Sequence, residues 1–101
     1  MKVILINTPK GQYHLPLLLI AEDRANYYAS KGGYLPDAQD YIDDVSLVMN
    51  DSYEGIDWLI NNFNWEDWED WELLASKVND DVKVSEDDFW TSSDDFEIVN
   101  I

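Results

Sequence analysis

The chain has 101 residues, of which 46% are hydrophobic and 14% aromatic, and its formal net charge is −16. Disordered acidic tails are poor in aromatic residues, so this composition predicts a single folded domain over residues 1–101. The lack of cysteine excludes disulfides and thiolate nucleophiles, and six basic residues against 22 acidic ones argue against direct nucleic-acid binding.

The first 16 residues predict a β-hairpin. Lys2–Asn7 is a short apolar run rich in β-branched residues, which is typical of a strand. A turn is expected at Thr8-Pro9-Lys10-Gly11, because proline fixes φ and glycine permits a positive φ. Gln12–Leu15 is then the second strand, and Pro16 limits it to a sheet edge or to a strand end.

Helices are expected in the middle of the chain. Gly32-Gly33 ends the first of them, and Asn50-Asp51-Ser52 supplies a break and a new N-cap. The fourth helix has acids in its first turn, where the helix dipole favours them. The four predicted helices are Leu17–Lys31, Asp37–Met49, Tyr53–Asn62 and Trp65–Lys77.

The C-terminal residues return to strands. Val82–Val84 predicts a brief strand, and Ser85–Asp95 reads as a loop in which Phe89 and Trp90 must pack against the core. Phe96–Ile101 predicts a last strand, paired with the first. The fold class is therefore α+β, with a small antiparallel sheet (N-terminal hairpin plus C-terminal strand) packed with three to four short helices.

The charge is unevenly distributed. Residues 1–36 hold four basic and two acidic residues, a net charge of +2, whereas residues 37–101 hold two basic and 20 acidic residues, a net charge of −18. Solubility or adaptation to high salt are alternative explanations, although a halophile usually spreads its acids along the whole chain. The asymmetry favours an acidic surface that binds a basic protein.

The most distinctive segment is Trp65–Glu72, with the sequence WEDWEDWE. On a helix its three tryptophans form a slowly rotating stripe. In one interpretation the stripe belongs to the core and the acids are its solvated face. In the other, at least one tryptophan is an exposed contact anchor ringed by carboxylates, over which a partner's Arg or Lys can sit.

Acids also recur in pairs at Asp43-Asp44, Asp80-Asp81, Asp87-Asp88 and Asp94-Asp95, and the last three pairs are seven residues apart. Chance spacing is one explanation. The other is mimicry of duplex DNA, a rod of regularly spaced negative charge whose phosphates, like carboxylates, accept bidentate bonds from arginine. The predicted partner-binding residues are Glu66, Asp67, Glu69, Asp70, Asp80, Asp81, Asp87, Asp88, Trp65 and Trp68.

Catalytic and metal-binding motifs are lacking in the sequence. His14 is the only histidine, and no nucleophile elbow, phosphate-binding loop or zinc-protease motif occurs. Asp80–Asp88 is rich in carboxylates but lacks the spacing of a calcium-binding EF-hand loop. We therefore predict no enzyme activity, no cofactor and no specific metal site.

Three segments carry a resemblance to known proteins: Thr8–Lys31 (TPKGQYHLPLLLIAEDRANYYASK), Met49-Asn50-Asp51 and Ile56-Asp57-Trp58. In this pattern, over about the first two thirds of the chain, the protein resembles small uncharacterised proteins encoded by phages and mobile elements. That group transfers no activity and no functional residue. Its setting implies a class, because small acidic phage proteins are often inhibitors of host defence, including DNA-mimic anti-restriction and anti-CRISPR proteins.

Two functions follow as hypotheses. The first is a DNA-mimic inhibitor, of anti-CRISPR or anti-restriction type, that binds a nucleic-acid-binding host protein. The alternative is a protein-interaction module or homodimer with an aromatic interface of Trp58, Trp65, Trp68 and Trp90, in which the charge serves solubility.

A cytoplasmic location is expected, in the host if the protein is phage-encoded. Met1–Ile6 does not read as a secretory signal. The longest apolar run, Leu15–Ala21, is too short to span a membrane.

Overall fold

The computed structural model describes residues 1–33, 38–64, 66–90 and 93–101. It has an α+β fold, as the sequence predicts, with a four-stranded antiparallel sheet. Two short 3₁₀ turns, η1 and η2, accompany the helices and strands. The elements in chain order are β1 (Lys2–Thr8), β2 (Gly11–Pro16), α1 (Leu17–Gly32), α2 (Gln39–Asn50), α3 (Ser52–Asn62), α4 (Trp68–Trp71), η1 (Glu72–Leu74), β3 (Ser76–Asn79), η2 (Ser93–Asp95) and β4 (Phe96–Asn100).

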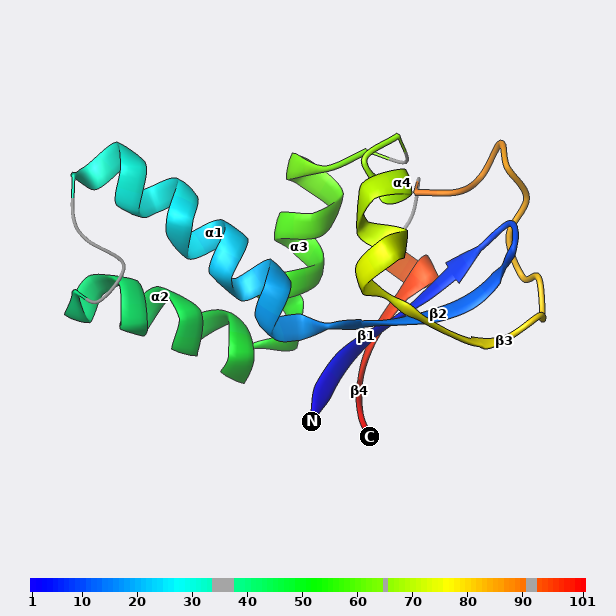
Figure 1. Cartoon of the computed structure of the whole chain (residues 1–101), viewed down its shortest axis with the longest axis horizontal. Coiled ribbons are helices and arrows are strands. Elements are labelled where there is room, and N and C mark those ends of the chain that lie inside the picture. The colour runs from blue at the N-terminus through cyan, green and yellow to red at the C-terminus, as the bar shows by residue number, and fades with distance from the viewer. Residues whose placement is uncertain (34–37, 65, 91–92) are drawn as a thin grey trace.

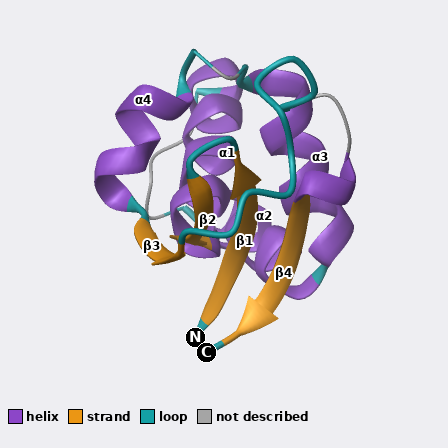
Figure 2. Ribbon diagram, turned by 90° about the vertical axis from the view of Figure 1, so that its right-hand side faces the viewer, coloured by secondary structure: helices purple, strands orange, loops and turns teal. Residues whose placement is uncertain are grey.

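The molecule is elongated, with extents of 41 × 26 × 22 Å. The sheet and α4 form one end, while α1 and α2 project side by side as an antiparallel pair at the other (Figure 1). Between them stands α3, which contacts both α1 and α2. The loop after β3 passes the tip of the β1–β2 hairpin (Figures 1 and 2).

The sheet has the strand order β3-β2-β1-β4 (Figure 2). This confirms both the predicted hairpin and the predicted pairing of the last strand with the first. Because side chains alternate along a strand, two rows of apolar side chains lie on the same face and begin the core. The rows are Leu15–Ile4–Ile98 and Tyr13–Ile6–Phe96.

Local signals set most helix ends. β2 ends at Pro16 and α1 follows at once, in agreement with the position expected for this proline. Gly33 caps α1 in the left-handed conformation, with φ of 74° and its N–H bonded to Ala29 O at 2.8 Å. The carboxylate of Asp51 accepts a hydrogen bond of 3.0 Å from Tyr53 N and so caps α3. The predicted start of the second helix at Asp37 lies outside the described residues.

The predicted helix Trp65–Lys77 is wrong in extent. The helix α4 covers only Trp68–Trp71, η1 continues it to Leu74, and Ser76–Asn79 forms the edge strand β3. In the sheet, Lys77 pairs with Tyr13 and Ser76 pairs with His14. This strand pairing replaces the hydrogen bonds of a helix at these residues. Tertiary pairing thus overrides the local helical pattern in this segment.

The predicted strand Val82–Val84 is also wrong, because the strand that joins the sheet lies six residues earlier, at Ser76–Asn79. Hydrogen bonds between amide side chains explain why residues 76–79, and not residues 82–84, form the edge strand. Asn79 Nδ2 donates to Gln12 Oε1 at 2.6 Å, and Gln12 Nε2 donates to Asn7 Oδ1 at 2.6 Å. Gly11 permits the close approach, since a Cβ there would lie 2.5 Å from Asn79 O.

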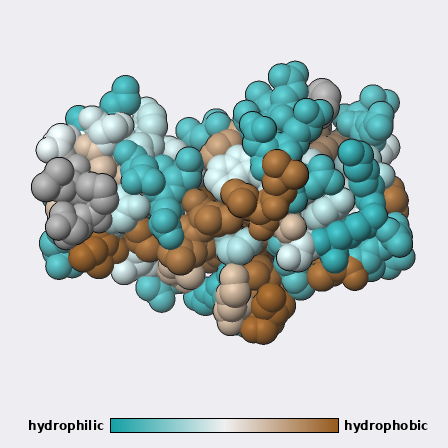
Figure 3. Space-filling view, in the orientation of Figure 1, coloured by the Kyte–Doolittle hydropathy of each residue, from teal (hydrophilic) through white to brown (hydrophobic). Residues whose placement is uncertain are grey.

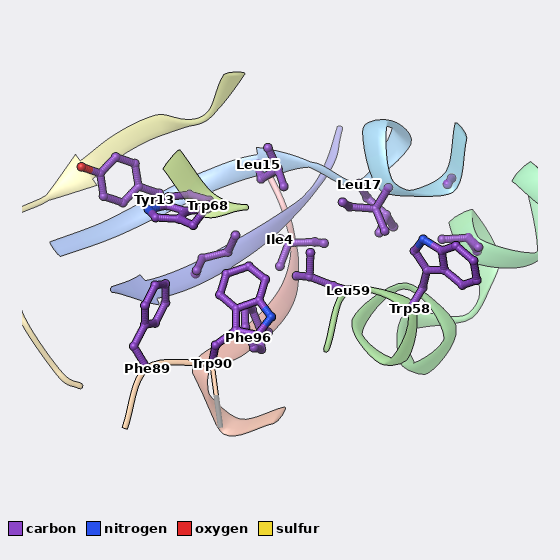
Figure 4. Close-up of a cluster of buried hydrophobic side chains, with 14 of the residues drawn as sticks. Ile4, Tyr13, Leu15, Leu17, Trp58, Leu59, Trp68, Phe89, Trp90 and Phe96 are labelled. Atoms are coloured by element: carbon purple, nitrogen blue, oxygen red, sulfur yellow. The ribbon is translucent and has the colours of Figure 1, made fainter. Parts of the chain in front are cut away.

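Aromatic side chains extend the core above the sheet (Figure 4). Trp68 packs edge-on against Tyr13 with 5.3 Å between ring centroids, and Trp90 packs edge-on against Phe96 at 4.9 Å. Trp90 has a positive φ of 71°, which is unusual for a bulky residue, and its indole N–H donates to Phe63 O at 3.0 Å. As the sequence predicts, Phe89 and Trp90 pack into the core.

Close packing at Gly55 joins α3 to the other helices. A Cβ at this position would lie 2.8 Å from Leu17 Cδ1 and 3.3 Å from Val48 Cγ1, and both of these side chains are fully buried. The glycine therefore allows the three helices to meet.

We expect Gly55→Ala to lower the free energy of unfolding by about 1–2 kcal/mol, because an added methyl group in a filled site forces its neighbours to move. Helix propensity alone would give the opposite sign, a gain of about 1 kcal/mol. Urea denaturation followed by tryptophan fluorescence measures the difference. Leu17→Val in the Gly55→Ala background should recover part of the loss, and a variant more stable than the parent would contradict the close contact.

Candidate partner-binding surface

The acidic side chains lie on the surface. Every Asp and Glu whose side chain the structure describes is exposed or half-buried. Even if all six basic residues were paired with acids, 16 of the 22 acids would remain unneutralised. The negative charge is therefore presented to solvent, and to any molecule that approaches.

Internal contacts already engage several basic residues. Arg24 lies 3.8 Å from Asp44 and 3.9 Å from Glu54, and its guanidinium sits 4.9 Å from the ring centre of Tyr28. Lys2 Nζ donates to Met49 O, at the C-terminal end of α2, at 2.6 Å. Arg24 and Lys2 thus link separate elements of the fold.

The turn before α4 places two of the predicted acids. Asn64 N donates to the Asp67 carboxylate at 2.9 Å, and Glu66 N donates to Asn64 Oδ1 at 2.9 Å. These hydrogen bonds close the turn that precedes α4, and the following residue, Trp68, is buried. Glu66, Glu69 and Asp70 remain exposed.

A second turn at Ser85–Asp88 repeats this arrangement. Ser85 Oγ donates to the Asp88 carboxylate at 3.0 Å, and Asp88 N donates to Ser85 O at 3.2 Å. The next residue, Phe89, is buried, while Glu86 and Asp87 are exposed at the turn. Both turns therefore send an aromatic residue inward and carboxylates outward.

A cleft of about 680 Å³ lies between α4 with η1, the turn at Ser85–Asp88 and the tip of the hairpin; we call it the acidic cleft. Three separate segments line it: Thr8, Pro9 and Lys10; Trp68, Glu69 and Glu72; and Glu86, Asp87 and Phe89. The structure thus brings together Trp68, Glu69 and Asp87 from the predicted set. Glu72 and Glu86 were missed, although both belong to the acid-rich segments that the sequence singled out.

One carboxylate of the acidic cleft is held in place. Tyr13 Oη donates to Glu72 Oε1 at 2.8 Å, across from β2 to η1. Burial raises the pKa of the Tyr13 hydroxyl, and the hydrogen bond and negative charge of Glu72 raise it further. Tyr13 therefore stays protonated as a donor and orients Glu72.

The predicted pair Asp80-Asp81 lies at the end of β3. Lys77 Nζ is 2.6 Å from the Asp80 carboxylate, and this hydrogen bond and charge lower the pKa of Asp80. Asp81 N donates to Asn79 Oδ1 at 2.9 Å. The three acid pairs spaced seven residues apart thus differ in their surroundings, since Asp80 bonds a lysine and Asp88 closes a turn.

The interpretation of Trp68 as an exposed contact anchor is wrong, because only 6% of its surface is exposed. Trp58 and Trp90 are each 8% exposed, so the predicted aromatic interface is wrong for these residues too. Packing against the sheet and α1 uses their surface instead (Figure 4). Trp65 lies outside the described residues.

The pKa of the Asp95 carboxyl is raised in the folded protein. Burial raises its pKa, a hydrogen bond with the backbone of Trp90 opposes this, and the negative charges of Asp94 and Asp88 raise it further. One of its oxygens, Oδ2, is buried without a hydrogen-bond partner. Ionised Asp95 is therefore disfavoured in the folded state.

Among the residues that the structure describes, no group of three or more His, Cys, Asp and Glu side chains could hold a metal ion. Within the described ranges, no helix combines the length and the apolar character needed to cross a membrane.

Comparison with known proteins identifies no relative: no protein-family model, no curated protein and no solved structure matches the chain.

We expect Asp95→Asn to raise the free energy of unfolding at neutral pH by about 1 kcal/mol, because the amide removes a charge that is partly buried without full hydrogen bonding. The pKa of Asp95 is higher in the folded than in the unfolded state, so folding favours its protonated form. The advantage of the variant should therefore shrink as the pH falls through the folded-state pKa. Urea denaturation at neutral and mildly acidic pH tests this, and an advantage independent of pH would contradict it.

Proposed function

We propose that the protein is an acidic inhibitor that occupies the nucleic-acid site of a basic host protein, as a DNA mimic of the anti-restriction or anti-CRISPR type. The observation that carries the proposal is the net charge of −18 on residues 37–101, whose described carboxylates lie at the surface. Such a surface attracts a protein that has a groove lined with Arg and Lys.

Elementary electrostatics supports this mechanism. Carboxylates accept the same bidentate bonds from arginine as phosphates do. Long-range attraction between the acidic protein and a basic groove accelerates encounter, and it weakens as salt screens the charges. The elongated shape, 41 Å by 26 and 22 Å, suits a groove that normally holds a rod-shaped duplex.

The setting of the proposal comes from sequence. The resemblance of residues 8–31 and two later segments to small proteins of phages and mobile elements supports a setting in a host cytoplasm, where defence nucleases act. The partner in this proposal is a nucleic-acid-binding host protein, and the acidic protein itself does not bind nucleic acid.

The alternative, a protein-interaction module, is favoured by a different observation. Leu73 is 86% exposed and Leu74 57% exposed. The face of the molecule that Figure 3 draws has hydrophobic surface across its middle, between the α1–α2 pair and α4. Since Trp58, Trp68 and Trp90 are buried, an interface of this kind would use these leucines in place of the tryptophans. A homodimer through them would also have to bring two strongly negative surfaces together.

Affinity capture from host lysate, with washes at low and then high salt, tests the proposal. We expect a nucleic-acid-binding protein that is released by moderate salt and displaced by duplex DNA. A partner that resists high salt and ignores duplex DNA would contradict mimicry and support the module.

Matched variants separate the two functions further. The triple variant Glu66→Lys, Asp70→Lys and Asp81→Lys should weaken binding of the captured partner about 100-fold or more, because like charges in contact cost several kcal/mol. The control Leu73→Ser with Leu74→Ser should bind normally. The reverse result would assign binding to the leucines, and circular dichroism checks that both variants fold.

A further inference from the structure

We infer that the face of the sheet turned away from the helices joins two copies of this chain into a weak two-fold dimer. We call it the outer sheet face. This contact is separate from the proposed function, which uses the acidic surface, because the outer sheet face is the part of the molecule with the fewest acids.

Strand register defines the outer sheet face. Side chains that sit opposite each other on paired strands point to the same side of the sheet, and neighbours along a strand point to opposite sides. The helices pack on the side of Ile4 and Ile6, so the other residues of β1 and their partners make the outer face. Its accessible side chains at the centre are Leu5, His14, Pro16, Glu97 and Val99.

Among the described helices, none packs on this face. In Figure 2, α1 and α2 lie behind the strands, and the loop after β3 crosses in front of their upper part, near the hairpin tip. The main hydrophobic cluster includes Ile4 and Ile6 from β1 but, within the described residues, neither Leu5 nor Val99. Both of these apolar side chains are half-buried, so part of their surface is open to a partner.

Charge favours this face for contact between two copies. Each copy has a net charge of −16, so two copies repel unless they meet where carboxylates are few. The four described strands hold a single acid, Glu97, together with Lys2 and Lys77, whereas the whole chain holds 22 acids. The sheet is therefore the one layer of the fold that does not share in the negative charge.

One row of the outer sheet face is complementary to itself. Leu5 lies opposite both His14 on β2 and Glu97 on β4, so the order across the sheet is His, Leu, Glu. A two-fold axis parallel to β1, midway between two facing sheets, places Leu5 on the Leu5 of the second copy. It also places His14 of each copy against Glu97 of the other, so the same contact forms twice.

Both polar groups of this row are available. Among the described residues, neither the His14 imidazole nor the Glu97 carboxylate has a hydrogen-bond or ion-pair partner. An imidazole N–H donates to a carboxylate, and sheets packed about 10 Å apart let side chains from both layers meet. In the next row, Pro16 and Val99 both lie opposite Val3, so the same axis packs Pro16 against Val99 of the second copy.

Other contacts between copies are less suitable. The edge strand β3 has only four residues, carries Lys77 and pairs irregularly with β2 at Gln12 and Tyr13, and these features hinder the addition of another strand. The exposed Leu73 and Leu74 directly follow a segment, residues 69–72, in which three of four residues are acids. Two copies that met through these leucines would bring those acids together.

The expected dimer is weak because the face is small. Four strands about 4.8 Å apart, each with about five residues at about 3.3 Å rise, offer about 300 Å² of flat area. Stable complexes bury about 800 Å² of accessible surface on each partner. The dimer should therefore form only at high protein concentration.

Sedimentation equilibrium of the full chain, from micromolar to millimolar concentration, tests the inference. We expect the mass to rise from 11.8 kDa toward twice that value. Because salt screens the repulsion between two negative copies, the dimer should tighten about threefold or more from low to high salt. A mass that stays at 11.8 kDa at millimolar concentration in high salt would overturn the inference.

Amide shifts of the ¹⁵N-labelled chain locate the contact. As the protein concentration rises, we expect shifts at Leu5, His14 and Glu97 and none at Leu73 and Leu74. The opposite pattern would assign the dimer to the leucines and overturn the assignment to the sheet.

Charge variants test the contact of His14 with Glu97. His14→Glu sets carboxylates against each other twice in the dimer, so it should weaken dimerisation about 100-fold or more. Adding Glu97→Lys restores opposite charges and should bring the affinity back to within about fivefold of the parent. The control Asn26→Glu adds the same charge on α1, away from the sheet, and should cost less than about twofold.

Two results with these variants would contradict the contact. One is a double variant that is folded by circular dichroism and stays monomeric. The other is an equal loss of dimer for His14→Glu and Asn26→Glu, which would mean that only net charge matters.

The dimer and the proposed function can fail separately. Binding of a basic partner should weaken with salt, whereas dimerisation should strengthen. A monomeric chain that still captures a nucleic-acid-binding protein would overturn the dimer alone. A dimer with the expected shifts and no such partner in the lysate would overturn the proposed function alone.

Discussion

Packing of two indole rings onto the sheet is the interaction on which the rest of the structure depends. Trp68 rests on Tyr13, Trp90 rests on Phe96, and the two indoles lie 6.3 Å apart between ring centroids. Through them α4, the loop after β3 and, by the bond from Trp90 to Phe63 O, the end of α3 are attached to the strands. Burial of large aromatic rings supplies the free energy that offsets repulsion within a chain of charge −16.

The same packing distributes the acids. Trp68 and Phe89, each of which follows a turn, are buried, whereas the nearby carboxylates of Glu69 and Asp87 are exposed. The alternation of aromatic and acidic residues in these segments thus produces both the packing onto the sheet and the negative surface. Since α4 with η1 and the turn at Ser85–Asp88 both flank the hairpin tip, their carboxylates converge on the acidic cleft.

Sequence reasoning succeeded for three features whose decisive contacts are local, and also for the pairing of the last strand with the first, which joins the two ends of the chain. The hairpin, the glycine cap at Gly33 and the N-cap at Asp51 depend on neighbours a few residues away, and the structure has all three. It failed at β3, because the amide contact from Asn79 to Gln12 spans 67 residues and no periodicity reports it. Of the residues that line the cleft, the sequence singled out only Trp68, Glu69 and Asp87, since the shape of the cleft requires three distant segments to meet.

Position 90 shows a conflict between backbone and side chain that bears on how the protein can evolve. A left-handed backbone with φ of 71° suits glycine, whereas the space among Trp68, Phe89 and Phe96 suits an indole. Glycine would relax the backbone and empty the core, and medium-sized residues would satisfy neither demand. Trp90 therefore cannot be replaced stepwise by smaller residues without a loss of stability. The loop that Trp90 attaches to the core should keep its conformation in evolution, while the exposed acids around it can change.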